Sequence, residues 1–206
     1  MSPVVSAAVA LALLAAFGLL GFGWRALLQH RRTGSTGFRG ISGRVGSLEW
    51  IAGVGFVVAL IVTLVGPALQ FLKIVAPLSF RHAEWTHITG FAAAAVGIAL
   101  TVWAQLEMGD SWRVGVDVNE TTELVQNRVF GYVRNPIYTA ILVFEFGISL
   151  LATHFVTIAG LVLAIAALEL QVRRVEEPYL LAKHGPVYRR YTASVGRFIA
   201  GVGLIG

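Results

Sequence analysis

The stretch RNPIYTAILVFEFGISLL, residues 134–151, decides the fold. It places a cation, an amide and a proline directly before an apolar run that would dissolve in lipid. Proline suits the first turn of a helix, because the N–H group that it lacks would have no partner there. The whole chain is equally apolar, with 56% hydrophobic residues, 13% charged residues and a mean hydropathy of +0.75. This composition predicts an integral membrane protein, since soluble domains are far more polar.

Five segments are predicted to cross the membrane, because a spanning helix needs roughly 20 mostly apolar residues. The last two are short and are separated only by ATHF, which favours a tight helical hairpin; a re-entrant hairpin is the alternative. The predicted fold is an all-α integral membrane bundle of about five transmembrane helices in one domain, 1–206, with a cytoplasmic C-terminal helical tail. The spans are about 4–23, 49–72, 85–106, 137–152 and 155–172.

The basic residues predict the orientation of these spans. Fourteen of the 16 lysines and arginines fall on one side if the N-terminus is outside, and only Lys73 and Arg81 fall on the other. Basic loops stay in the cytoplasm, so the C-terminus is predicted to be cytoplasmic. The formal charge of +5 is thus explained by topology, and no nucleic-acid partner is predicted. Abundant arginine, alanine, valine and glycine favour a bacterial inner membrane protein, and the first span reads as a retained anchor.

Two interpretations fit the residues around Pro136. In the simpler one, Asn135 caps the helix, Arg134 contacts a lipid phosphate and Tyr138 belongs to an interfacial aromatic belt. In the other, the free N–H groups and positive dipole of the helix start bind a carboxylate or phosphate, and Arg134 adds a bidentate donor. The residues alone leave both open.

The tail carries a second polar cluster. Glu169, Arg173 and Glu176 are spaced to share one face of a helix that continues out of the fifth span. Glu176 and its neighbour Glu177 have two interpretations. They form solvent-exposed ion pairs with the preceding arginines, or they bind a ligand, since a carboxylate can accept hydrogen bonds from two vicinal hydroxyls or neutralise a cation. Further on, Tyr188 and Tyr191 flank two arginines, a pattern typical of an amphipathic interfacial helix.

Glu145 lies inside the fourth predicted span. An ionised carboxylate is costly in lipid, so such a residue normally faces protein or water and is a candidate functional group. Cysteine is absent and the five histidines show no metal-ligand spacing, so no metal is predicted.

In order and spacing, three pieces of the chain resemble the isoprenylcysteine carboxyl methyltransferase and phospholipid methyltransferase superfamily of integral membrane enzymes. They are MGDSWRVGVD, LVQNRVFGYVRNPIY and EEPYLLAKHGPVYRRYTASVGRF, which lie within about residues 108–198. The resemblance implies that S-adenosylmethionine binds in a cytoplasm-facing pocket formed by the last two spans and the tail. Residues 1–107 would then form a three-span scaffold, and residues 108–200 the cofactor-binding region.

The resemblance also assigns roles to individual residues. The family's cofactor motif falls on Arg134, Asn135, Pro136 and Tyr138, and its paired acids and tail tyrosines fall on Glu176, Glu177, Tyr188 and Tyr191. The chain departs from the pattern with Asn135 for histidine, Ala140 for glycine and Ser194 for a functional arginine. We take Arg197, which lies close to that position, and the intramembrane Glu145 as the candidate catalytic residues.

The predicted activity is methyl transfer from S-adenosylmethionine to a lipophilic small molecule or lipid, with S-adenosylhomocysteine as product. The departures leave the acceptor and the methylated atom open. One alternative is an NADPH-dependent reductase of the sterol-reductase type, because those enzymes have a similar C-terminal region. Another is a non-catalytic membrane assembly protein. No oligomeric state is predicted.

Overall fold

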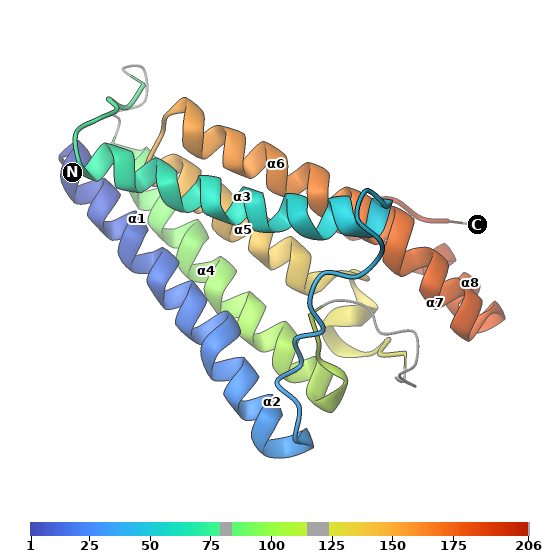
Figure 1. Cartoon of the computed structure of the whole chain (residues 1–206). Coiled ribbons are helices and arrows are strands. Elements are labelled where there is room, and N and C mark those ends of the chain that lie inside the picture. The colour runs from blue at the N-terminus through green and yellow to red at the C-terminus, as the bar shows by residue number, and fades with distance from the viewer. Residues whose placement is uncertain (79–83, 115–123, 206) are drawn as a thin grey trace.

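A computed structural model describes residues 1–78, 84–114 and 124–205. Within these residues the chain is helical and forms no strands, only isolated β-bridges (Figure 1). The predicted all-α fold is confirmed. The main elements are α1 (Pro3–Phe17), η1 (Gly18–Trp24), α2 (Arg25–Thr33), α3 (Leu48–Phe71), α4 (Glu84–Met108), α5 (Pro136–Leu151), α6 (Phe155–Gln171), η5 (Val172–Glu176), α7 (Glu177–His184) and α8 (Pro186–Ser194).

Four continuous helices are long and apolar enough to cross a membrane, and each covers one of the predicted spans to within one residue. The first and the last extend well beyond the predicted spans, to Thr33 and His184. The fifth predicted span is the shorter helix α5, whose 16 residues cover about 24 Å against a hydrocarbon core of roughly 30 Å. Because most of α5 is buried against its neighbours, protein rather than lipid surrounds it.

Two helix pairs build the bundle: α5 packs along α4, and α6 packs along α3. Small residues permit the close approach. A Cβ atom added to Gly97 would lie 2.6 Å from the backbone nitrogen of Phe144, and one added to Gly160 would lie 2.9 Å from that of Thr63. Backbones that approach this closely gain van der Waals contact, which is the main attraction between helices in lipid.

The core between the pairs is apolar with one buried polar link. The ring of Phe17 stacks on that of Phe144, with centroids 4.2 Å apart. The next residue, Glu145, is fully buried and accepts a hydrogen bond of 2.6 Å from the Thr63 hydroxyl. This bond joins α5 to α3 inside the bundle.

The polar segments gather at one end of the bundle, where α2, α4 and α6 end and α3 and α5 begin (Figure 1). Helices α7 and α8 lie at the same end. The basic residues that predicted the orientation are on these segments, whereas Lys73 is at the opposite end; Arg81 lies outside the described residues. The bundle is therefore strongly asymmetric in charge.

Candidate functional site

A cavity opens at the polar end of the bundle. Its volume is about 1220 Å³ when the open space at its mouth is included. Segments from every part of the chain line it, including η1, α3, the end of α4, the start of α5 and the tail. Its predicted residues are Arg134, Asn135, Pro136, Tyr138, Glu176, Tyr188 and Tyr191.

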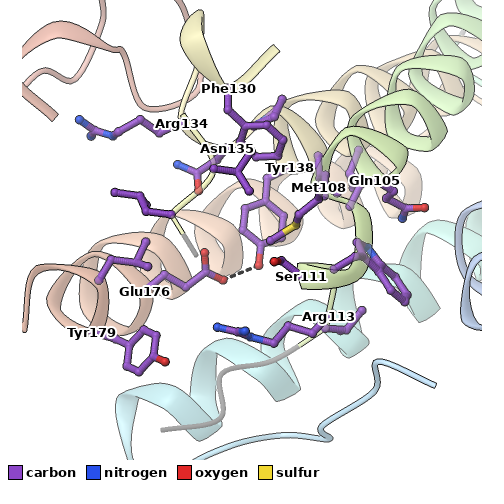
Figure 2. Close-up of a pocket in the computed structure, with 18 of the residues that line it drawn as sticks. Gln105, Met108, Ser111, Arg113, Phe130, Arg134, Asn135, Tyr138, Glu176 and Tyr179 are labelled. Carbon is purple, nitrogen blue, oxygen red and sulfur yellow. Dashed lines mark hydrogen bonds between the residues drawn. The ribbon is translucent and has the colours of Figure 1, made fainter. Parts of the chain in front are cut away.

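The Tyr138 hydroxyl and the Glu176 carboxylate meet inside this cavity (Figure 2). The hydroxyl donates to Glu176 Oε1 at 2.5 Å, and Gln171 Nε2 donates to the same oxygen at 3.3 Å. Glu176 lines the cavity, so its carboxylate borders any ligand that binds there. Two residues 38 positions apart in sequence thus form one polar centre.

A π-helical turn explains the direction of Glu176. Glu169 and Arg173, predicted to share one helix face with Glu176, form an ion pair, whereas Glu176 bonds Tyr138. Residues Val172–Glu176 form η5, whose wider turn adds a residue relative to an α-helix. The side chains that follow are rotated by about 100° relative to an unbroken α-helix, and Glu176 faces Tyr138 instead of Arg173.

The adjacent Glu177 lies in a different environment. Its carboxylate bridges two arginines: Arg134 donates to Oε1 at 2.8 Å, and Arg197 donates to Oε1 at 2.7 Å and to Oε2 at 3.0 Å. All three residues are buried. The hydrogen bond that Arg197 donates to Glu177 is the main reason that the pKa of Arg197 is raised. We call Arg134, Glu177 and Arg197 the arginine–glutamate cluster.

Arg134 also holds the backbone of the tail. Its two terminal nitrogens donate to the carbonyl oxygens of Thr192, Val195 and Gly203 at 3.0–3.1 Å. These bonds and Glu177 occupy both nitrogens, and only Nε lacks a partner among the described residues. The bidentate anion contact predicted for Arg134 would have to displace them, although Arg134 does line the cavity.

Asn135 does not cap α5 with its side chain. Its Nδ2 and its backbone nitrogen both donate to the Arg197 carbonyl oxygen at 3.1 Å. Pro136 is at the first helical position, as predicted, and the backbone N–H groups of the next two residues have no side-chain cap. Since Ile137 and Tyr138 line the cavity, the positive end of α5 borders it.

Tyr188 and Tyr191 of α8 are buried side by side, with ring centroids 6.2 Å apart. The Tyr191 hydroxyl donates to the Phe130 carbonyl oxygen at 2.6 Å. Burial raises the pKa of Tyr191 to about 12, and burial together with the negative charge of Glu177 raises the pKa of Tyr188 further above its usual value. Both rings therefore present neutral phenols to the cavity at physiological pH.

Comparisons with known proteins identify the family and the fold of the chain. The family model of the phospholipid methyltransferases matches residues 85–186, about half of the chain. The chain belongs to the phospholipid and isoprenylcysteine carboxyl methyltransferase superfamily. The structure of a eukaryotic intramembrane Ras methyltransferase, an isoprenylcysteine carboxyl methyltransferase, has the same fold, with a TM-score of 0.64 at 20% identity over 100% of this chain and 70% of that one. None of the curated proteins compared with the chain matches it in sequence.

Three of the predicted site residues of this membrane methyltransferase are outside the cavity lining. Glu177 and Arg197 lie behind it in the arginine–glutamate cluster. Glu145 lies deeper in the bundle, two helical turns from Tyr138 on α5; Thr63 bonds its Oε2, and its buried Oε1 has no partner among the described residues. Their predicted contacts with cofactor or acceptor stay predictions.

Other residues of the methyltransferase cavity were not predicted. Tyr179 and Trp112 lie within the motif segments that resemble the superfamily, and that proximity could have identified them. Phe22 and Phe56 carry no such signal, since they are apolar residues within spans. Their position depends on how the first two passes pack against α5.

Proposed function

We propose that this protein transfers a methyl group from S-adenosylmethionine to a lipophilic, membrane-partitioned acceptor at the cytoplasmic face of the membrane. The Tyr138–Glu176 centre carries this proposal, because it joins the two motif segments within one cavity. Superfamily membership supports methyl transfer. The proposed acceptor is a small molecule or lipid of the same membrane.

The described side chains fit the donor's chemistry. The Glu176 carboxylate in the cavity wall suits ribose hydroxyls or a nearby cation, and the aromatic faces of Tyr179 and Tyr188 suit adenine and a sulfonium. The uncapped start of α5 suits the amino-acid carboxylate. When bound, S-adenosylmethionine supplies an electrophilic methyl group on that sulfonium. The chain's contribution is chiefly positioning, with water excluded by the surrounding helices.

The acceptor is proposed to bind at the apolar side of the cavity. Phe22 from the first pass, Phe56 from α3 and Ile141 from α5 converge there. These apolar side chains can make dispersion contacts with a lipid-like group, and they carry no charge that could bind a polar group. The three-span scaffold proposed for residues 1–107 thus contributes directly to the acceptor end, while residues 108–200 supply the donor end.

The proposed orientation places the cavity in the cytoplasm of a bacterial cell. The basic segments that flank the cavity support it, because positive loops remain on the cytoplasmic side of the inner membrane. Cytoplasmic S-adenosylmethionine would reach the cavity mouth from water. The acceptor would reach the apolar side from the bilayer.

Ligand-dependent unfolding of the purified protein in lipid nanodiscs tests the donor. S-adenosylhomocysteine at a hundred times its Kd should add about 2.7 kcal/mol to the stability of the native state, and NADPH should add nothing. Tyr138→Phe should weaken binding about tenfold, whereas the control Tyr132→Phe, at an exposed tyrosine, should not. Stabilisation by NADPH alone would instead identify a reductase.

Product analysis tests the acceptor. The protein is incubated with methyl-labelled S-adenosylmethionine and a total membrane lipid extract, and labelled products are identified by mass spectrometry. The expected product is a methylated species that partitions into the organic phase. Donor binding without any labelled lipid, across extracts from several bacteria, would argue for a soluble acceptor.

A further inference from the structure

Arg25 is a buried arginine in the first pass, outside the region that the family model matches. Only 1% of its surface is exposed. It directly follows the π-helical segment Gly18–Trp24, and the helix continues past it to Thr33. Arg25 follows the first predicted span at the start of a basic segment, so its burial needs a structural reason.

The reason is the end of α4. Arg25 Nη2 donates to the Gly109 carbonyl oxygen at 2.6 Å, and Nη1 donates to Gln29 Oε1 at 2.9 Å. Gln29 Nε2 in turn donates to the Asp110 carbonyl oxygen at 2.7 Å. A cation is favoured at this position because carbonyl groups at a helix C-terminus lack intrahelical partners. Helix α2 therefore caps α4 from the side.

Trp112 is held by the same arginine. The Arg25 guanidinium lies 4.6 Å from the centroid of the Trp112 ring, a cation–π contact. Phe38, from the loop after α2, packs edge-on against that ring, with centroids 6.2 Å apart. Gly37 is close enough that an added Cβ would lie 2.7 Å from the ring. Trp112 is thus enclosed between α2 and this loop.

The backbone after Trp112 is fixed as well. Val114 donates its N–H to the Gly37 carbonyl oxygen at 2.9 Å, and its own carbonyl oxygen accepts from the Arg39 N–H at 3.0 Å. Residues Gly109–Val114 are therefore bound to the N-terminal pass at both ends. We call these six residues the wall segment.

The wall segment is one side of the cavity. Ser111, Trp112, Arg113 and Val114 line it, and Figure 2 shows Ser111 and Arg113 beside the Tyr138–Glu176 centre. We propose that Arg25 is a positioning residue: by holding Gly109 and Trp112 it sets the wall segment at the distance from Tyr138 and Glu176 that a bound ligand requires. This inference rests on the proposed function, since it concerns the same cavity.

The proposal makes ligand affinity depend on a residue that no motif includes and that does not line the cavity. In Arg25→Gln the shorter, neutral side chain cannot reach the Gly109 carbonyl oxygen and the Trp112 ring together. The wall segment would then sample several positions, and a ligand would bind only the fraction that is correctly placed. We expect S-adenosylhomocysteine to bind about tenfold more weakly.

The test combines ligand binding with a ligand-free probe of Trp112. The protein is labelled with 5-fluorotryptophan in nanodiscs, and the ¹⁹F resonance of Trp112 is assigned from the signal that Trp112→Phe removes. In Arg25→Gln this resonance should shift or broaden, while that of Trp85, at the opposite end of α4, should not. Arg25→Lys should partly restore both the signal and the affinity. Arg31→Gln, at an exposed arginine of α2, is the matched control.

The outcomes separate this inference from the proposed function. A wild-type Kd and an unchanged Trp112 resonance in Arg25→Gln would overturn it. If S-adenosylhomocysteine fails to bind even the wild type, the proposed function fails, and the ¹⁹F signals still decide whether Arg25 holds the wall segment. Should Arg25→Gln not fold, Arg25→Lys and Gln29→Ala carry the same two measurements. A weaker Kd with an unshifted Trp112 signal would also count against the inference.

Discussion

Glu177→Gln offers a sharp test of how the tail is held over the cavity. The change keeps the size of the side chain and removes its charge. In the native state this buried carboxylate accepts hydrogen bonds of 2.7–3.0 Å from Arg134 and Arg197. A glutamine has one acceptor oxygen and brings an NH₂ group against two guanidinium groups. Both arginines would remain buried without a compensating charge.

The expected cost follows from that loss. Removing one partner of a buried ion pair costs about 3–5 kcal/mol, because the remaining charge stays desolvated. The cluster joins Glu177, on the extension of α6 beyond the bundle core, to the start of α5 and to the tail, so the cost should fall on docking at this end of the bundle. At about 1.4 kcal/mol per tenfold change, tail opening should become ~10²–10⁴ times more frequent.

Hydrogen exchange measures this opening residue by residue. The amides of Arg134 and Asn135 bond the tail carbonyls of Gly196 and Arg197, and the Ile205 amide bonds Thr192. In Glu177→Gln these three should lose protection, and S-adenosylhomocysteine should bind more weakly because Tyr188 and Tyr191 move with the tail. Glu169→Gln, which breaks a partly exposed ion pair on the same continuous helix, should cost at most about 1 kcal/mol and leave the three amides protected. Unchanged exchange in Glu177→Gln would refute a fastening role for the cluster.

Three further predictions concern other parts of the molecule. Gly97→Leu should lower the free energy of unfolding by about 1–3 kcal/mol or more in denaturant titrations, because the new leucine side chain would meet the backbone of Phe144. The control Gly18→Ala should not lower it, because Gly18 has open space around it. Glu145→Gln should retain the hydrogen bond from Thr63 and the wild-type free energy of unfolding, whereas Thr63→Val should lower that free energy by about 1–3 kcal/mol. If Glu145→Gln loses turnover while its affinity for the methyl donor is unchanged, the predicted catalytic role of Glu145 is supported. The folded protein favours the neutral form of Tyr191, because burial raises its pKa to about 12. The contribution of Tyr191 to stability should therefore be complete below about pH 10, the pKa of an unfolded tyrosine, and be lost as the pH rises through about 12. The difference in Tm between the wild type and Tyr191→Phe should shrink over that interval.

The spans could be predicted closely because lipid imposes a strong constraint. Predicted spans of about 49–72 and 155–172 correspond to α3 at Leu48–Phe71 and α6 at Phe155–Gln171. An exposed backbone polar group is so costly in hydrocarbon that the apolar run and the helix nearly coincide. The start of α5 at Pro136 could also be predicted, because proline favours the first turn of a helix.

The directions of the charged side chains could not be predicted in the same way. Arg25 follows a π-helical segment and Glu176 ends another, and Glu176 points away from the face that a regular helix would give it. Neither π segment has a clear sequence signal, because tertiary packing decides whether a turn widens. The partners of Arg134, which come from residues 177–203, depend on the path of the tail after α8.

The two adjacent glutamates show how much depends on this local geometry. Glu176 ends η5 and points into the cavity toward Tyr138, while Glu177 begins α7 and points away from it to Arg134 and Arg197. Successive residues on a helix differ in direction by about 100°, so one pair of acids can serve two environments at once. The first lines the cavity where a ligand would bind, and the second neutralises the arginines that fasten the tail over that ligand. Moving the register by one residue would leave one of these two environments without its carboxylate.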